Sequence, residues 1–187
     1  MYKIIFILLL TFSFIHAVEP DDTTVIWKKY LQDTKEPALS DINTTTSYRL
    51  ILHSAMGGTE AYVRISKKDN AYFTYIGWAD WSNGLKYFEY IFPLSLKTWN
   101  RLTKYITNDS FYNLKNYESH GGLDGGSMII EGIKNGEYHY VDRWNHNSNA
   151  KERQLIEFNK LTDELYHKHL LKIKRWFLFI KQAKERN

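Results

Sequence analysis

Four side chains that could carry acid–base chemistry lie in one stretch of the chain: Asp124, Glu131, His139 and Arg143. A histidine beside a carboxylate can transfer protons near neutral pH, and an arginine can hold an anionic phosphate or acyl substrate. This set predicts a small hydrolase as one function. No Gly-x-Ser-x-Gly motif and no cysteine accompanies it, however. We therefore favour a structural interpretation, with Asp124 as a turn residue and the arginine as an interior ion-pair partner.

A second group of chemical interest lies in the C-terminal part. Glu164 and His167 are three residues apart, which resembles half of a di-iron ligand set, but the sequence lacks the second copy that such a site needs. His167 and His169 would lie about 200° apart around a helix and could not bind one metal together. The glycine-rich run 121–126 precedes a predicted strand rather than a helix, which argues against a phosphate-binding loop. We therefore expect neither a metal nor a cofactor.

The element that positions the first group is a predicted β-hairpin. Asn135-Gly136 stands between two runs with alternating apolar residues, and this dipeptide is typical of a two-residue type I′ turn. Such a turn fixes the register, so that Lys134 pairs with Glu137 and Ser127 with Trp144. Glu131 and Asp142 then share one face as either a carboxylate pair or two hydrogen-bond acceptors, whereas His139 and Arg143 share the opposite face.

The remaining periodicity predicts the rest of an α+β fold. Four segments rich in β-branched and aromatic residues alternate with period two and are joined by short connections: 48–54, 60–66, 71–78 and 85–92. They predict an antiparallel meander, which the hairpin extends to about six strands. Short helices are expected at 25–31 and 95–106, and a long C-terminal helix at about 150–184. We expect the helices to lie on one face of the sheet.

The N-terminus reads as a targeting segment. Met1 to Ala17 has a basic start, an apolar run too short to span a membrane and a small residue at its end, as in a cleavable signal peptide. The remaining residues 18–187 are expected to form a single domain. The chain has no cysteine, so an exported form must be stable without disulfides. We therefore expect a periplasmic rather than an extracellular location.

The positive charge is concentrated at the C-terminus. Residues 167–187 carry seven Lys or Arg and one acid, whereas the whole chain has a formal net charge of +4, so the rest of the chain is net acidic. This distribution argues against a nucleic-acid-binding body. A basic helix with a bulky apolar cluster could instead lie on an anionic membrane surface, or it could pack on its own sheet. The residues that would contact a membrane are Lys172, Trp176, Phe177, Phe179 and Lys181.

The hairpin region resembles a group of small, exported, uncharacterised bacterial proteins. The matching residues are Leu123-Asp124-Gly125, Glu131-Gly132, Gly136-Glu137-Tyr138-His139 and Arg143-Trp144, in that order. The chain departs from the group's pattern in two places, because the first hairpin strand has no Trp and Asn145-His146 stands where the group has Ser-Pro. The resemblance covers roughly residues 48–144 and implies export, but it implies no mechanism.

From these observations we expect a non-enzymatic binding or interaction module. Its partner would be an unknown protein or envelope component, and the contact residues would be exposed aromatic side chains around loop 79–84, since aromatics dominate binding hot spots. These are Tyr72, Trp78 and Trp81. The alternatives are the small hydrolase and a protein that associates with the membrane surface through its C-terminal helix.

Overall fold

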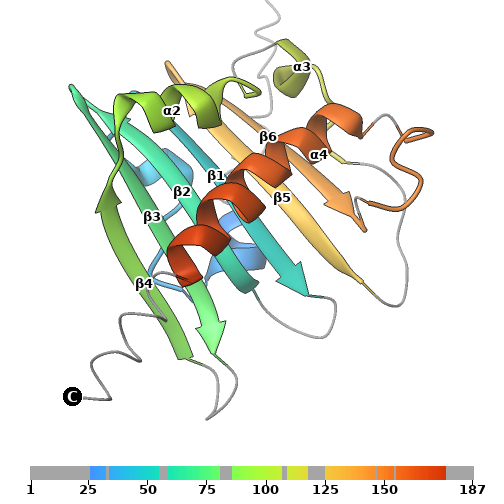
Figure 1. Ribbon diagram of the computed structural model, residues 1–187, viewed down its shortest axis with the longest axis horizontal. Helices are drawn as coiled ribbons and strands as arrows, with labels where there is room; N and C mark the ends of the chain where they lie inside the picture. Colours follow the sequence, from blue (N-terminus) through green and yellow to red (C-terminus); the bar gives the residue numbers. More distant parts are fainter. Residues whose placement is uncertain are drawn as a thin grey trace, which may run out of the picture.

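The computed structural model is an α+β fold built on a six-stranded antiparallel sheet (Figure 1). It describes residues 26–32, 34–54, 59–80, 86–106, 109–117, 125–145, 147–153 and 155–175. The strand order is β4-β3-β2-β1-β5-β6, so the meander and the hairpin join through β1 and β5. The strands are β1 (Thr46–Ser54), β2 (Thr59–Lys68), β3 (Ala71–Asp80), β4 (Lys86–Pro93), β5 (Gly126–Lys134) and β6 (Glu137–Trp144). The predicted fold class is confirmed.

The β5–β6 hairpin has the predicted turn and register. Asn135 and Gly136 have φ values of 53° and 84°, as a type I′ turn requires. Lys134 pairs with Glu137, and the pairing continues without a shift to Ser127 and Trp144. The alternation of side chains between the two faces of this hairpin is therefore the one that the sequence predicts.

The helices α2 (Leu96–Thr103), α3 (Asp109–Tyr112) and α4 (Ile156–Thr162) lie on one face of the sheet, which we call the helix face (Figure 1). Helix α2 begins where expected, because the Ser95 side chain accepts a hydrogen bond from the Thr98 amide. Helix α4 continues as the π-helix η3 (Asp163–Leu170), and helical structure extends to residue 175.

The C-terminal helix begins at Ile156 rather than at the predicted residue 150. Before it, the Arg153 guanidinium donates hydrogen bonds to the carbonyl oxygens of Trp144 at 2.7 Å, Ser148 at 2.8 Å and Asn145 at 2.9 Å. Asn149 has a φ of 50°, in the left-handed region. Residues before Ile156 therefore form turns rather than helix, because these carbonyl oxygens accept hydrogen bonds from the Arg153 side chain instead of from main-chain amides of a helix.

The main core lies between the sheet and these helices. Leu50, Val63, Ile65, Ile76, Ile130 and Val141 are fully buried on the sheet, and Trp99, Leu102, Phe158, Leu161 and Leu165 pack on them from the helices. Each fully buried side chain of this size contributes about 1.5–3 kcal/mol. The amphipathic pattern of the helices thus attaches them to their own sheet.

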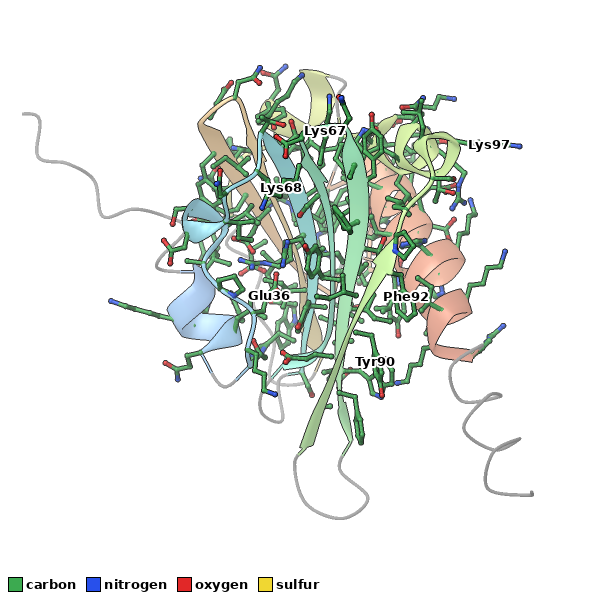
Figure 2. All side chains as sticks on the ribbon, turned by 90° about the vertical axis from the view of Figure 1, so that its left-hand side faces the viewer. Glu36, Lys67, Lys68, Tyr90, Phe92 and Lys97 are labelled. Atoms are coloured by element: carbon green, nitrogen blue, oxygen red, sulfur yellow. The ribbon has the colours of Figure 1, made fainter. Side chains whose placement is uncertain are left out.

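The opposite face is covered by residues 26–32 and 34–45, which we call the strap, and we call this face the strap face. The strap contains the π-helical turn η1 (Trp27–Leu31) and the 3-10 turn η2 (Leu39–Asp41). In the view of Figure 2 the sheet stands edge-on between the strap and the helices. A small apolar cluster holds one part of the strap and consists of Ile26, Tyr30, Leu31, Ile51, Tyr62 and Ile129. The sequence did not predict this third layer.

Candidate functional site

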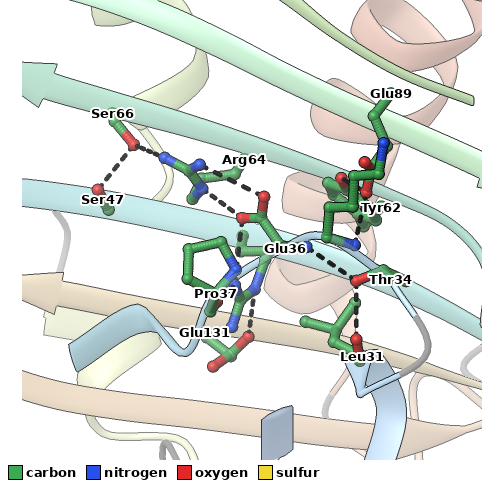
Figure 3. A network of polar contacts seen from close by, with 12 residues as sticks. Leu31, Thr34, Glu36, Pro37, Ser47, Tyr62, Arg64, Ser66, Glu89 and Glu131 are labelled. Carbon is green, nitrogen blue, oxygen red and sulfur yellow. Dashed lines mark hydrogen bonds and ion pairs between the residues drawn. The ribbon is translucent and has the colours of Figure 1, made fainter. Parts of the chain in front are cut away.

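The strap is held to the sheet by a network of buried charges (Figure 3). Glu36 of the strap binds two guanidinium groups, Arg49 of β1 at 3.2 Å and Arg64 of β2 through its Nε. Arg49 Nε also binds Glu131 Oε2 of β5 at 2.7 Å. All four side chains are at most 5% exposed. Two cations therefore face two anions in a site that excludes water.

The environment of this network favours the charged form of Arg49. Burial alone would lower the pKa of Arg49, but the Glu131 and Glu36 carboxylates outweigh that effect and raise it. Arg49 Nη1 also donates a hydrogen bond to the Pro37 carbonyl at 2.7 Å, which fixes the strap backbone. We expect these buried ion pairs to specify one position of the strap on the sheet.

A pocket of about 270 Å³ opens beside this network, between residues 35–37 of the strap and the strands β2, β3 and β4. The Glu89 carboxylate accepts hydrogen bonds from the Lys35 amide and the Tyr62 hydroxyl, each at 2.9 Å. The Arg64 guanidinium lies 3.6 Å from the centre of the Tyr75 ring, a cation–π contact. The residues that line the pocket are Lys35, Glu36, Pro37, Tyr62, Arg64, Tyr75, Glu89, Tyr90 and Ile91.

One glycine makes room for the floor of this pocket. A Cβ built on Gly77 would lie 2.3 Å from the Tyr62 ring, closer than any real contact. Because Gly77 has no side chain, the Tyr62 ring can lie over β3 and bring its hydroxyl to Glu89. Burial is the main cause that raises the pKa of Tyr62, so its hydroxyl stays protonated as a donor.

The pocket borders the outer edge of β4, which we call the open edge. The Leu94 amide donates to the Tyr72 carbonyl, so by the alternation of an antiparallel ladder the Phe92–Thr74 and Tyr90–Ile76 pairs are bonded to β3. The N–H and C=O groups of the alternate residues Glu89 and Ile91 therefore point away from the sheet. Within the described residues, no strand pairs with this edge. The Ile91 side chain is 64% exposed.

Pro93 fits the same geometry. It lies opposite Phe73, in the alternation that directs its nitrogen outward, so its missing N–H removes no bond to β3. The open edge thus combines outward main-chain groups, an exposed apolar side chain and an adjacent pocket with aromatic walls. An edge of this kind can pair with an added strand and can receive that strand's alternate side chains.

The four residues of the predicted acid–base group are not brought together. Glu131 lies on the strap face, whereas His139 and Arg143 lie on the helix face, and Asp124 is outside the described residues. The Asp142 carboxylate, on the same face as Glu131, accepts a hydrogen bond from Tyr30 at 2.7 Å, and Glu131 accepts one from Tyr138 at 3.1 Å. Both carboxylates therefore have hydrogen-bond donors from other elements.

His139 and Arg143 have structural neighbours on the helix face. The His139 ring contacts the Phe111 ring edge-to-face at 5.1 Å, and burial is the main cause that lowers its pKa. The Arg143 guanidinium donates to the carbonyls of Lys115 at 2.6 Å, Asp142 at 2.8 Å and Asn116 at 3.4 Å. Arg143 thus fixes a loop against β6 and, among the described residues, binds main-chain carbonyls rather than Glu131.

The aromatic residues predicted for partner contact also occupy different positions. Trp78 is only 5% exposed, so its predicted exposure is wrong. Its side chain shares the helix face with Ile76 and stacks on Tyr90 and Phe88, with ring centres 5.4 and 6.0 Å away. Tyr72 is half-buried against Trp99, and Trp81 is outside the described residues.

Of the predicted membrane contacts, only Lys172 is described, and it is exposed. Trp176, Phe177, Phe179 and Lys181 are outside the described residues, as is the predicted signal peptide. Within the described part of the chain, no helix is long and apolar enough to cross a membrane.

Residues with metal-ligand chemistry do not gather in the described part of the chain. No three His, Asp or Glu side chains there are close enough to hold a metal ion. Glu164 pairs with Arg101 at 3.0 Å and Lys168 at 2.7 Å. The His169 ring instead lies 2.9 Å from the Thr74 hydroxyl of β3.

Sequence reasoning missed Glu36, Arg49 and Arg64. Each arginine lies in the middle of a predicted strand, between two apolar or aromatic residues in sequence. This pattern indicates a buried ion pair. Its partner could not be assigned, because Glu36 lies in a polar segment before the sheet. The open edge was also missed, since strand order does not follow from the strand pattern alone.

Comparison with known proteins adds no relative to this picture. No protein-family model matches the chain, and no curated protein matches it. The function must therefore be argued from the site itself.

Proposed function

We propose that this chain is an exported, non-enzymatic binding module that takes up an extended segment of a partner protein at the open edge of β4. The observation that carries the proposal is the main-chain edge at Glu89 and Ile91, with which no described strand pairs, beside a pocket of about 270 Å³. Addition of a strand to such an edge gives affinity through main-chain hydrogen bonds. The periplasmic location and the resemblance to small exported bacterial proteins are parts of the same proposal.

The pocket supports a partner of particular chemistry. Both carboxylates of the pocket are already engaged, because Glu36 binds two arginines and Glu89 accepts hydrogen bonds from the Lys35 amide and the Tyr62 hydroxyl. Its remaining surface is made mainly of tyrosine rings and the Ile91 side chain. An aromatic or aliphatic side chain on the added strand would fit this environment, since aromatic and arginine side chains are the usual hot spots of binding surfaces.

The test uses a variant that removes one outward donor and no bond within the sheet. Random peptides displayed on phage are selected on the purified protein, and the affinities of the selected peptides are measured by fluorescence anisotropy. Ile91→Pro should abolish binding, and Ile91→Ala should weaken it. Ile156→Ala is the matched control, because Ile156 is also exposed, at 51%, but lies on α4. Peptides that bind Ile91→Pro as well as the unaltered protein would refute the proposal.

A further inference from the structure

A second hollow lies on the helix face, between α2 and the C-terminal helix, beside the end of β4. It has a volume of about 550 Å³ and is separate from the strap-face pocket. It is lined by Pro93, Leu94, Ser95, Thr98, Arg101, Lys168, His169, Lys172 and Ile173. Three of these side chains are permanent cations and none is a carboxylate.

The positive charge of this hollow is only partly compensated. Arg101 pairs with Glu164 at 3.0 Å, and Lys168 pairs with Glu164 at 2.7 Å and with Asp163 at 2.9 Å. Lys172 has no ion pair with any described residue, and it is exposed. Three cations therefore face two carboxylates, and both carboxylates bind from outside the lining of the hollow.

The buried histidine of the hollow responds to this excess charge. His169 is 7% exposed, and its Nε2 lies 2.9 Å from the Thr74 hydroxyl. Burial, followed by the positive charges of Arg101 and Lys172, lowers the pKa of His169 to about 4. At neutral pH the ring is therefore uncharged, which is the form that the positive charges of Arg101 and Lys172 favour.

The rest of the lining suits a molecule with both a polar and an apolar part. Ser95 and Thr98 place hydroxyl groups at the start of α2, and the Ser95 hydroxyl lies 3.0 Å from that of Thr98. Leu94 and Ile173 present half-buried apolar side chains at the edge of the main core. The hollow thus offers cations and hydroxyls beside an apolar wall.

We propose that this hollow binds the phosphate group of a small amphiphile. Lys172, Lys168 and Arg101 hold the phosphate oxygens by charge-assisted hydrogen bonds, while the apolar part lies against Leu94 and Ile173. A soluble phosphate ester and the headgroup of an anionic lipid share this chemistry. The site is distinct from the open edge, and neither proposal depends on the other.

Two probes distinguish the sources of the phosphate. Calorimetry measures the binding of sn-glycerol 3-phosphate, and sedimentation measures the binding of phosphatidylcholine vesicles with and without phosphatidylglycerol. We expect Lys172→Gln to weaken the binding of whichever probe occupies the hollow by about tenfold, and added salt to weaken it further because the charges are partly exposed. Lys97→Gln is the matched control, because Lys97 is an exposed cation of α2 that projects outward from the fold (Figure 2) and does not line the hollow.

The outcomes separate cleanly. Binding of glycerol phosphate alone, reduced by Lys172→Gln and not by Lys97→Gln, supports a soluble ester. The same pattern with phosphatidylglycerol vesicles supports a lipid headgroup. Failure of both probes to bind, or equal binding by the two variants, overturns the proposal. Circular dichroism of each variant checks that the fold is retained.

Discussion

The two outer edges of the sheet are treated in opposite ways. At β6, the Asp142 amide donates to the Asn116 carbonyl at 2.8 Å, and Arg143 fixes the same loop through the carbonyl oxygens of Lys115 and Asn116. At β4, Glu89 and Ile91 direct their main-chain groups away from the sheet. Edge strands are commonly covered, bent or charged to prevent pairing with other chains. In this chain a loop covers the β6 edge, whereas among the described side chains of the β4 edge only Pro93 and the charged Glu89 are features that disfavour pairing.

The faces next to these edges differ as well. The β1–β5 part of the sheet lies under the strap and holds buried ion pairs, whereas Ile91 of β4 lies beyond the strap at 64% exposure. Among the described residues, the ion pairs of the strap network lie on β1, β2 and β5, whereas the strap reaches β4 through a hydrogen bond from the Lys35 amide to Glu89. From this difference we expect the open edge to accept a strand without loss of the fold.

The largest expected effect is on the anchored part. Glu36→Ala removes the carboxylate that binds both Arg49 and Arg64, and of the network only Glu131, which binds Arg49, remains as an anion. Breaking a buried ion pair in this way costs about 3–5 kcal/mol. Urea denaturation followed by tryptophan fluorescence measures the free energy of unfolding. Glu157→Ala is the control, because Glu157 forms an exposed pair with Lys160 and should change stability by at most about 0.5 kcal/mol. Equal effects of both variants would show that the strap is not anchored by this network.

A pH effect is expected where the C-terminal helix meets β3. The pKa of His169 is lowered to about 4 in the folded chain, against 6.5 when unfolded, so the unfolded state binds more protons between these values. His169 therefore leaves the free energy of unfolding unchanged above pH 6.5. As the pH falls from 6.5 to about 4, protonation of the unfolded chain lowers the free energy of unfolding by roughly 3 kcal/mol. Denaturation curves at several pH values measure it. In His169→Gln the additional loss over this window should disappear, and a loss that persists unchanged would assign the pH effect to other groups.

The hydrogen bonds of Arg143 at the β6 edge should contribute less to the free energy of unfolding. Arg143→Met removes the donors to three carbonyl oxygens while it keeps an apolar stem, and we expect a loss of about 2 kcal/mol. Hydrogen exchange of the Asp142 amide should become faster, because its acceptor is in the released loop. The Val141 amide serves as the internal control, since Val141 is fully buried. Unchanged exchange at Asp142 would mean that the loop is held by other contacts.

The smallest effect on stability is expected at the open edge. Ile91→Pro should change the free energy of unfolding by less than about 0.5 kcal/mol, because this N–H makes no bond to β3. Tyr90→Pro, one position away, removes a ladder bond and also the ring that stacks on Trp78, and it should cost more than about 1 kcal/mol. Thermal denaturation of the two variants compares them directly. A large loss in Ile91→Pro would reverse the assignment of outward and inward groups along β4.

Local sequence signals predicted the hairpin and missed the anchor. Asn135-Gly136 alone fixes which residues pair in β5 and β6, since a two-residue turn leaves no freedom of register. The Glu36 network joins residues 13 to 28 positions apart, and Glu131 binds an arginine 82 positions away. No local pattern identifies such partners, because they meet only after strands distant in sequence have paired.

The sequence contained a signal for the burial of Trp78, but the adjacent turn-like residues led to the opposite prediction. Its neighbours Tyr72, Thr74 and Ile76 share its parity along β3 and all face the helices, which predicts burial of the tryptophan ring. The adjacent turn-like residues 79–84 favoured exposure instead. The open edge, in contrast, had one local signal, Pro93 at the end of β4, because proline within a sheet is confined to edge strands, first residues and bulges. The rest of the β4 sequence does not state whether the strand is central or outer.

The strap also has a consequence for the order of folding. It is synthesised before every strand of the sheet, yet its binding surface is complete only when β1 has paired with both β2 and β5. The first described segment to leave the ribosome is therefore expected to be among the last to reach its final position. Interactions that form so late act mainly on the unfolding rate, so the strap governs how long the folded chain persists rather than how fast it is made.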